Sequence, residues 1–375
     1  MGLELKKKIV KLYEAAVINL YVKPRHILSL HRRKDLYAAK SYYPEKESRA
    51  PWKNYLLQLE QIIRYGAPNE FFFMYGFDVK NREERNTYMN YQPFMARRNY
   101  LNHDKNSHNS TCILRNKLYF DLFARSIGVQ TPRVIAYYTN NQLYSVENGF
   151  SQISFTELAN IGDQTLFCKE MAGECGAGIF KLKIASGKFY KNDTEISSRE
   201  IESLIHDSDY IFQELVKQHP RMSELYSMSV NTMRLVTVRN MKDGKIHLMP
   251  SILRVGANGS FVDNTSQGGL AVGFNLETGQ LHQYGFHKPQ YGLRTETHPD
   301  SGIRLSDFYI PFIKEAEEKA IYFHSMLKDI HSIGWDIAIG KDGPVFIEGN
   351  DNWEINGPQV GNRGLKIEFE EYFYD

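Results

Sequence analysis

The chain lacks several features that would assign it to a specialised class of protein. Its 375 residues include only three cysteines, Cys112, Cys168 and Cys175, and their spacing matches no metal-ligand pattern. So sparse and odd a set is typical of a reducing compartment. No run of ~18 apolar residues occurs, so we expect no transmembrane helix. Lysines interrupt the apolar residues near the start, so we also expect no signal peptide.

A large excess of charge of either sign is also missing, but the charge is unevenly distributed. The net charge is +2, whereas residues 1–49 hold 12 Lys and Arg against 5 Asp and Glu, a net of +7, which leaves −5 for the rest. The acidic remainder and the lack of a recognisable motif argue against nucleic-acid binding. The composition, 42% hydrophobic and 24% charged, is that of a globular protein, and the length predicts two or three subdomains.

The basic start of the chain predicts an amphipathic helix. Apolar residues recur at helical spacing opposite the lysines: Leu5, Ile9, Leu12, Tyr13, Ala16, Val17 and Leu20. Such a helix can rest on an anionic membrane surface. The apolar face of a helix more often packs on its own protein, and we favour that alternative. Residues 1–49 are therefore a candidate for peripheral membrane contact, with packing as the preferred interpretation.

The chain divides into three predicted regions. Residues 51–100 are rich in aromatic side chains, and the polar stretch 102–110 predicts a linker, so residues 1–110 form an N-terminal region. A lid subdomain over 111–216 and a metal and acceptor subdomain over 217–375 follow. Their predicted helices span 114–127, 195–206 and, from a Ser306 cap, 306–330. Their predicted strands span 134–138, 165–170, 179–184, 210–216, 231–239, 247–255 and 271–275. Helices mixed with antiparallel ribbons predict an α+β fold.

The most informative segment is a predicted hairpin near the end of the chain. Two apolar runs flank Lys341-Asp342-Gly343, which predicts a three-residue loop that places Asp336 opposite Glu348. Asn350 then lies on the same face as Glu348. Like charges directly opposite each other are destabilising, so two carboxylates and an amide oxygen indicate a cation, and such hard donors suit Mg²⁺. The alternative is an exposed hairpin with solvated acids, which its apolar residues disfavour.

A glycine-rich turn follows the strand predicted over 165–170. Gly173, Gly176 and Gly178 allow backbone N–H groups to point at an anion, and Lys169 lies where it can reach the same anion. A plain hairpin turn is the alternative, but a Lys within an apolar strand needs an anionic partner. No Gly-Lys-Ser/Thr follows, which excludes a Walker phosphate loop.

Two arginines and a polar loop complete the candidate site. Arg234 and Arg254 lie in neighbouring apolar strands, where each forms either a structural ion pair or an anion clamp; we favour the clamp because a guanidinium suits carboxylate and phosphate. The loop 263–269 is polar and glycine-rich. We expect it to line an acceptor site, and a wide turn between strands is the alternative.

Together these motifs resemble the ATP-grasp superfamily. Over residues 111–360 the resemblance rests on Asn116-Lys117-Leu118, Gly128-Val129-Gln130-Thr131-Pro132, Cys168-Lys169-Glu170 with its turn, Ile211-Phe212-Gln213-Glu214-Leu215-Val216, and Asp336 with Glu348-Gly349-Asn350. Within the superfamily, the chain is similar to the sugar-transfer-associated branch through Ser229-Val230-Asn231-Thr232-Met233-Arg234-Leu235, Val262-Asp263-Asn264 with Gly268-Gly269, and Gly334-Trp335-Asp336. Proteins of that branch are thought to serve cell-surface polysaccharide synthesis.

The resemblance implies an ATP-grasp fold, in which two α+β subdomains clamp ATP, preceded here by the N-terminal region. It implies nucleotide contacts from Lys117, Lys169, Gly173, Gly176, Gly178, Gln213, Glu214 and Val216. It implies that Asp336, Glu348 and Asn350 hold Mg²⁺. We expect the transferring phosphoryl group to be stabilised by Lys169, Arg234 and Arg254. We expect the acceptor site to be lined by Asn231, Asp263, Asn264, Gly268 and Gly269.

The resemblance also implies an activity, that of a Mg-ATP-dependent carboxylate–amine ligase that forms an acyl phosphate. Its expected partners are a small-molecule or glycan-precursor carboxylate and an amine, which an amino acid can supply. Three alternatives stay open: a kinase that phosphorylates a hydroxyl at the same site, a non-catalytic nucleotide- or glycan-binding module, and a peripheral membrane scaffold that uses residues 1–49. Gly334 and Asp351 depart from the usual pattern around the metal acids, which leaves the acceptor open. We expect a cytoplasmic protein, or one at the inner face of the membrane.

Overall fold

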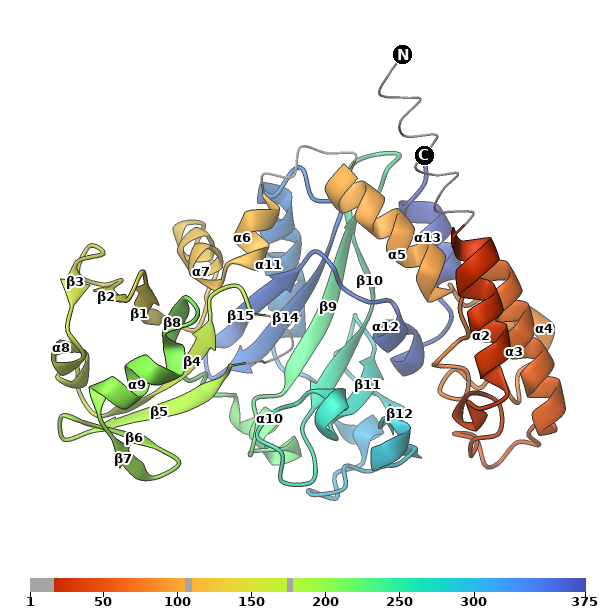
Figure 1. The fold of residues 1–375 in the computed structure, drawn as a ribbon, viewed down its shortest axis with the longest axis horizontal. Helices are drawn as coiled ribbons and strands as arrows, with labels where there is room; N and C mark the ends of the chain where they lie inside the picture. The colour runs from red at the N-terminus through yellow and green to blue at the C-terminus, as the bar shows by residue number, and fades with distance from the viewer. Residues whose placement is uncertain (1–16, 105–109, 174–177) are drawn as a thin grey trace, which may run out of the picture.

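The computed structural model describes residues 17–104, 110–173 and 178–375. It contains two antiparallel sheets side by side, with the helices of the N-terminal region beyond the second sheet (Figure 1). The N-terminal region contains η1 (Ile18–Val22), α2 (Lys23–Leu30), η2 (Lys34–Leu36), α3 (Pro51–Tyr65), α4 (Arg82–Asn86), α5 (Tyr91–Asn99) and η3 (Tyr100–Asp104). The basic helix expected over residues 5–20 lies largely outside the described residues.

The first sheet has eight strands in the order β3-β2-β1-β8-β4-β5-β6-β7. These are β1 (Val134–Thr139), β2 (Gln142–Ser145), β3 (Gln152–Ile153), β4 (Gln164–Glu170), β5 (Phe180–Ala185), β6 (Lys188–Lys191), β7 (Thr194–Ile196) and β8 (Tyr210–Glu214). Two helices cover its apolar face, α8 (Phe155–Ala159) and α9 (Ser198–Ile205). Both begin with a capping box, led by Ser154 and Ser197, so the local sequence sets where each helix starts.

The second sheet has seven strands in the order β13-β12-β11-β10-β9-β14-β15. These are β9 (Thr232–Arg239), β10 (Ile246–Val255), β11 (Leu270–Phe274), β12 (Leu281–Phe286), β13 (Arg294–Thr295), β14 (Ser332–Gly340) and β15 (Gly343–Asn350). The helical segments of this part are α10 (Pro220–Leu225), η4 (Thr265–Gln267), η5 (Pro289–Tyr291), η6 (Leu305–Asp307), α11 (Ile313–Met326), α12 (Asn356–Gly361) and α13 (Lys366–Tyr372). The α11 side chains pack on one face, and those of α5 and α13 pack on the other.

The helix predicted over 114–127 is two helices, α6 (Thr111–Arg115) and α7 (Lys117–Ser126). Asn116 separates them because it adopts an extended backbone and its side chain accepts from the N–H groups of Leu118 and Tyr119, as an N-cap does. Leu114, Phe120 and Ala124 of these helices join the core of the second sheet, although the sequence groups them with the first, whereas Leu118 packs with residues of the first sheet. Lys117 thereby stands at the first turn of α7, between the two sheets.

The helix predicted from Ser306 is also wrong at its start. Ser306 lies in the short segment η6, and the long helix α11 begins only at Ile313. Pro311 explains the interruption, since proline disfavours a helical backbone in the residue before it. The predicted strands agree with β1, β4, β5, β8, β9, β10 and β11 to within about two residues at each end.

The N-terminal region is packed on the second sheet. Tyr42 is buried and its hydroxyl donates to the carbonyl of His287, 2.8 Å away. The aromatic run that includes Phe72 and Tyr75 forms one apolar cluster with Phe286 and Val360. In the described part of the chain, no helix combines the length and the apolar character needed to cross a bilayer.

Candidate active site

The hairpin of β14 and β15 brings two carboxyl groups together at the edge of the second sheet. Asp336 pairs with Glu348 in the strand register, which confirms the predicted facing of the two acids. Asn350 pairs with Gly334, and its amide nitrogen lies 3.3 Å from Glu348 Oε1. Two carboxyl groups and one amide therefore share one end of the hairpin.

The predicted three-residue loop of this hairpin is wrong. Gly340 pairs with Gly343, so only residues 341–342 lie between the paired ends. A β-bulge follows, because the register shifts by one residue between Asp336 and Ile337. The one-residue shift at the bulge compensates for the shorter loop, so Asp336 still pairs with Glu348.

Two arginines from neighbouring strands hold Asp336. Arg234 Nε lies 2.6 Å from Asp336 Oδ1, and Arg254 Nη2 lies 2.8 Å from Asp336 Oδ2. Burial alone would raise the pKa of Asp336, but the two guanidinium charges outweigh it and hold that pKa well below its ordinary value. The structure therefore shows the ion pairs that the sequence left open, and the anion clamp stays a prediction.

Glu348 has the opposite electrostatic environment. Burial, and then the negative charge of Asp336, raise the pKa of Glu348 above its ordinary value. One carboxyl group is thus ionised and neutralised by arginine, while the other retains a proton more readily than a free glutamate. A cation between them would replace that proton.

The donors present fit a magnesium ion. Within the described ranges, no group of three or more His, Cys, Asp and Glu side chains could hold a metal. Asp336, Glu348 and Asn350 supply only hard oxygen donors, and Mg²⁺ commonly takes one or two carboxylates together with substrate phosphates and water. Two acids and one amide suit that ion, although its binding here stays a prediction.

Lys169 approaches the same place from the first sheet. It lies on β4, and its ammonium donates to Gln213 Oε1, 3.1 Å away. The pKa of Lys169 is lowered to about 8, mainly because of burial. The charge of Glu348 opposes this shift, and the charge of Lys117 adds to it. Charges from both sheets therefore act on one ammonium group. A buried cation that is only partly neutralised is suited to an anionic ligand.

Lys117 connects the second sheet to the glycine-rich turn. Its ammonium donates to the carbonyl of Gly173 at 2.5 Å, and its backbone N–H donates to the carbonyl of Met171 at 2.9 Å. Its charge lowers the pKa of Glu348. Lys117 thus lies between the turn and the acid pair.

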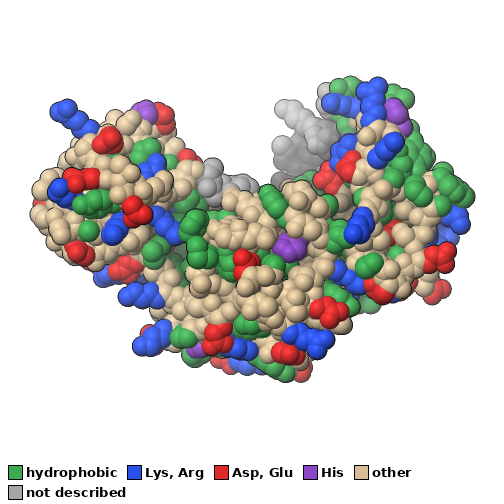
Figure 2. All heavy atoms as spheres, turned by 90° about the horizontal axis from the view of Figure 1, so that it is seen from below, with side chains coloured by type: hydrophobic (Ala, Val, Ile, Leu, Met, Phe, Trp, Pro, Cys, Tyr) green, Lys and Arg blue, Asp and Glu red, His purple; other side chains and the backbone are tan. Residues whose placement is uncertain are grey.

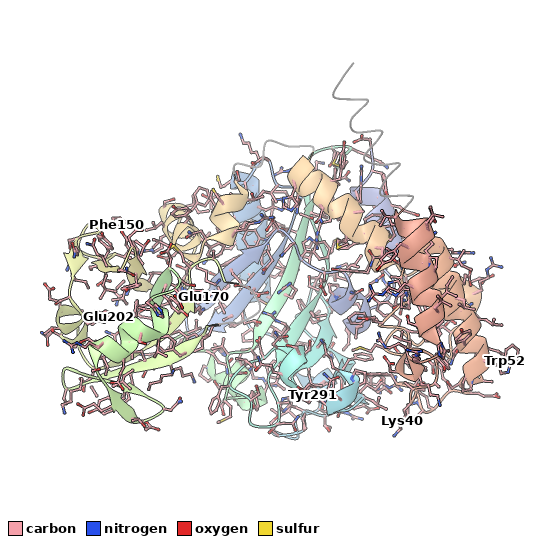
Figure 3. All side chains as sticks on the ribbon, viewed as in Figure 1. Lys40, Trp52, Phe150, Glu170, Glu202 and Tyr291 are labelled. Atoms are coloured by element: carbon pink, nitrogen blue, oxygen red, sulfur yellow. The ribbon has the colours of Figure 1, made fainter. Side chains whose placement is uncertain are left out.

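The turn itself requires glycine at two described positions. A Cβ on Gly173 would lie 2.7 Å from the Glu170 Cβ, and a Cβ on Gly178 would lie 2.8 Å from Glu170 Oε1. Gly178 also has a φ of +68°, which disfavours other residues. Gly176, which we expect to contact the nucleotide, lies outside the described residues. The sequence indicated Glu170 only as part of a motif, whereas in the structure its side chain (Figure 3) lies against both Gly173 and Gly178.

The segment expected to bind adenine begins on β8. The Gln213 side chain is fixed, since its Nε2 donates to the carbonyl of Pro132 at 2.8 Å while its Oε1 accepts from Lys169. Glu214 is the last residue of the strand and forms an ion pair with Arg133, 2.5 Å apart. The half-buried Val216 follows in the connection between the sheets. Recognition of adenine by Gln213, Glu214 and Val216 stays a prediction.

The loop 263–269 is anchored to the arginine pair. Asp263 Oδ2 accepts from the Thr232 backbone N–H at 3.0 Å and lies 3.8 Å from Arg254 Nε. Asn264 caps η4, where its Oδ1 accepts from a backbone N–H. Gly268 has a φ of +99°, and a Cβ on Gly269 would lie 2.5 Å from the Asp263 carbonyl oxygen. This part of the chain is therefore a specific loop next to the charged cluster rather than a loose turn.

Asn231 has a different position from the one expected. Its side chain is fully buried, with Nδ2 donating to the carbonyls of Met222 and Tyr226 and Oδ1 accepting from the Gly256 N–H. These contacts favour a structural role over contact with an acceptor. The neighbouring Thr232, which the sequence did not single out, is the residue that contacts both Arg254 and Asp263.

Asp351, which the sequence marked as an extra acid, has its own partners. Arg115 Nη2 lies 2.7 Å and His103 Nε2 lies 3.2 Å from Asp351 Oδ2. Gly334, the other departure, is required by packing, since a Cβ there would lie 2.6 Å from the Trp353 Cβ and 3.2 Å from the Arg234 Cδ. A larger residue at this position would clash with Trp353 and press against the side chain of Arg234.

Comparison with known families now identifies the chain. Residues 96–371 match the family described as sugar-transfer associated ATP-grasp. The chain belongs to this family. The match includes all the residues of the candidate site and excludes most of the N-terminal region. No curated protein sequence matches the chain.

Solved ATP-grasp structures resemble the chain only distantly. The N5-carboxyaminoimidazole ribonucleotide synthetase of Thermus thermophilus is 13% identical, with a TM-score of 0.35, over 65% of this chain and 47% of that one. The D-alanine–D-alanine ligase of Helicobacter pylori is 11% identical, with a TM-score of 0.40, over 72% of this chain and 63% of that one. The chain thus spans about half to two thirds of the length of these proteins.

A separate cavity of about 930 Å³ lies between α3, α4 and α13. None of the residues that line it belongs to the candidate site. It is part of the contact between the N-terminal region and the end of the chain.

Proposed function

We propose that this protein is a Mg-ATP-dependent ligase that joins a carboxylate to an amine through an acyl phosphate. The observation that carries the proposal is the convergence of charge from two sheets. The charges of Glu348 and Asp336 raise the pKa of Lys169 on the first sheet, and the charge of Lys117 on α7 lowers the pKa of Glu348. Phosphoryl transfer needs positioned cations and charge neutralisation more than covalent help from the protein.

The two lysines would bind the ATP phosphates from opposite sides. Lys169 would be charged when bound, because a phosphate favours the protonated form of a nearby ammonium. Asp336, Glu348 and Asn350 would hold Mg²⁺, which supplies charge neutralisation on the phosphate oxygens. Arg234 and Arg254, already placed on the strands beside the acids, would bind the carboxylate substrate and its phosphorylated form.

The reaction has two steps. An oxygen of the substrate carboxylate attacks the γ-phosphorus of ATP, the bond to the β-phosphate oxygen breaks, and ADP leaves. The amine nitrogen then attacks the acyl carbon, phosphate leaves, and the amine loses a proton to give an amide. Water must be excluded between the steps, since it would hydrolyse the acyl phosphate. We propose that the glycine-rich segment that begins at Gly173 and ends at Gly178 serves to exclude water.

The family and the loop 263–269 support a proposal for the substrates. Because the matched family is associated with sugar transfer, we propose a glycan precursor with a carboxyl group as one partner and an amine, such as an amino acid, as the other. Loop 263–269 would line the acceptor site, since Asp263 is anchored beside Arg254. The proposed place of action is the cytoplasm, in polysaccharide biosynthesis or modification.

Hydroxylamine trapping tests this proposal. Protein, Mg-ATP and pools of uronates, sugar acids and amino acids are incubated with hydroxylamine, and the products are identified by mass spectrometry. We expect a hydroxamate that depends on ATP and falls ~10²–10³-fold in Lys169→Ala and Glu348→Gln. Glu202→Gln, on the exposed surface of α9, is the matched control and should retain full turnover (Figure 3).

The other outcomes separate the alternatives. ADP together with a stable phosphoester and no hydroxamate would refute the ligase in favour of a kinase acting on a hydroxyl. Tight ATP binding without ADP from any pool would favour a non-catalytic nucleotide-binding module.

A further inference from the structure

Helix α3 buries two amide side chains together with Ile62 and leaves three large apolar side chains exposed. Asn54 and Gln58 point into the protein and are buried, where Gln58 Nε2 donates to the carbonyls of Leu36 and Asn69. The opposite face carries Trp52, Leu56 and Ile63, which are 62%, 54% and 60% exposed. Their spacing of four and seven residues places them on one stripe. A helix that buries amides and exposes Trp, Leu and Ile indicates a surface that contacts something else.

The neighbouring helix shows the same feature. Leu20 and Leu28 are 81% and 73% exposed, and together with Pro24 they recur every four residues along η1 and α2. Tyr21 is exposed beside them. On their inward sides, α2 and α3 pack together through a small core of Leu30, Leu36 and Ile62. We call the exposed residues Leu20, Tyr21, Leu28, Trp52, Leu56 and Ile63 the α2–α3 face.

Positive charge surrounds the α2–α3 face. Residues 18–65 contain ten Lys and Arg but only four Asp and Glu, whereas the whole chain carries only +2. Arg25 and Arg32 are exposed on α2 and just after it, and the Lys53 ammonium lies 5.5 Å from the centre of the Trp52 ring. Figure 2 shows hydrophobic and basic side chains next to each other on the arm of the molecule, at the right, that carries these helices.

We propose that the α2–α3 face binds the surface of an anionic lipid bilayer. Trp and Leu on one side of a helix, with Lys and Arg around them, is the composition of helices that lie in the membrane interface. The flanking cations complement anionic headgroups, which distinguishes this partner from a neutral protein surface. The face lies at one end of the molecule, so the two sheets of the candidate site stay clear of the bilayer (Figures 1 and 3).

This inference adds a location to the proposed ligase and rests on different residues. Binding to lipid needs neither ATP nor the acids of the site. Loss of lipid binding with ATP turnover retained would refute only the inference, and the reverse would refute only the proposed function.

Vesicle co-sedimentation of the full chain tests the inference. Phosphatidylcholine vesicles are compared with vesicles that contain about 30% phosphatidylglycerol, in low and high salt. We expect recovery only with the anionic vesicles, and less of it in high salt. Arg25→Gln with Arg32→Gln should weaken partitioning ~25-fold, about fivefold for each charge, and Trp52→Ser should weaken it ~10-fold.

Phe150→Ser is the matched control for Trp52→Ser. Phe150 is a 44% exposed aromatic residue at the opposite end of the molecule (Figure 3), so its loss should leave partitioning unchanged. Circular dichroism of each variant verifies folding. Equal recovery with neutral and anionic vesicles, or equal loss in Trp52→Ser and Phe150→Ser, would overturn the inference. Concentration-dependent dimerisation that disappears in Trp52→Ser, without any vesicle recovery, would assign the face to a second copy of the chain and would also overturn it.

Discussion

Amide replacements of the two facing carboxyl groups should have opposite effects on the free energy of unfolding. Asp336→Asn removes the negative charge that both Arg234 and Arg254 contact, and Asp336 is only 3% exposed. Removal of one partner from a buried ion pair leaves the other charge uncompensated, which costs ~3–5 kcal/mol. At ~2–4 °C per kcal/mol, the midpoint of thermal unfolding should fall by ~6–20 °C.

Glu348→Gln should instead stabilise the ligand-free protein. Because burial and Asp336 raise the pKa of Glu348, the folded protein binds this proton more tightly than the unfolded chain does. That contribution to stability is present below the ordinary pKa of about 4.5 and is lost as the pH rises through the raised value. The amide cannot ionise, so its advantage should grow from pH 4 to pH 8 and reach ~0.5–2 kcal/mol, the usual gain from replacing a strained functional group.

Urea unfolding of both variants and of the native chain at pH 4, 6 and 8 measures these differences. ATP turnover should be lost in both variants, so a variant that is more stable but inactive would identify Glu348 as a functional rather than a structural residue. The reasoning would be refuted if Glu348→Gln were destabilised as strongly as Asp336→Asn, or if its gain in stability were independent of pH.

Three further predictions concern neighbouring residues. The pKa of Lys169 is about 8, so ATP affinity, measured by calorimetry, should fall ~10-fold per pH unit above pH 8. Lys169→Arg should flatten this pH profile because its guanidinium stays charged. A flat profile of the native protein would contradict the prediction. Asn231→Ala should cost ~1–3 kcal/mol in urea unfolding, since it leaves buried partners unpaired, with ATP affinity unchanged; a changed affinity would restore Asn231 to the site. Thr232→Val should raise the acceptor KM several-fold at constant ATP affinity, because it removes the hydroxyl that contacts both Asp263 and Arg254. An unchanged KM would separate the loop from the acceptor.

Local patterns predicted the longer strands of the two sheets but missed β2, β3, β6, β7, β12 and β13 and the interruptions of two helices. Seven predicted strands are present because apolar alternation depends only on neighbouring residues. The helix predicted over 114–127 was wrong because Asn116 competes with the helix by capping its second part. Likewise, Pro311 separates Ser306 from α11. The predicted helix started at Ser306 because it followed the apolar pattern and did not take this proline into account.

In the hairpin of β14 and β15 the predicted pair of acids is correct, although the loop from which it was predicted is not. The facing of Asp336 and Glu348 is confirmed, yet the loop is shorter than expected and a β-bulge compensates for it. A bulge leaves no clear trace in residue types, because it depends on how β14 pairs with β9 on one side and with β15 on the other. The sequence therefore indicated the pair of acids without indicating the path of the chain between them.

Residue types and spacing predicted seven strands, the facing acids and the chemical character of the site, and the resemblance of the motifs indicated the family, because these depend on short segments. Tertiary packing decided which groups interact. Arg234 and Arg254 form ion pairs with Asp336, and Asn231 is buried in the core. Side chains of α6 and α7 pack in the core of the second sheet. These contacts depend on the burial and pairing of groups that lie far apart in the chain, such as Lys169 and Glu348. Only the assembled fold therefore decides which of them form.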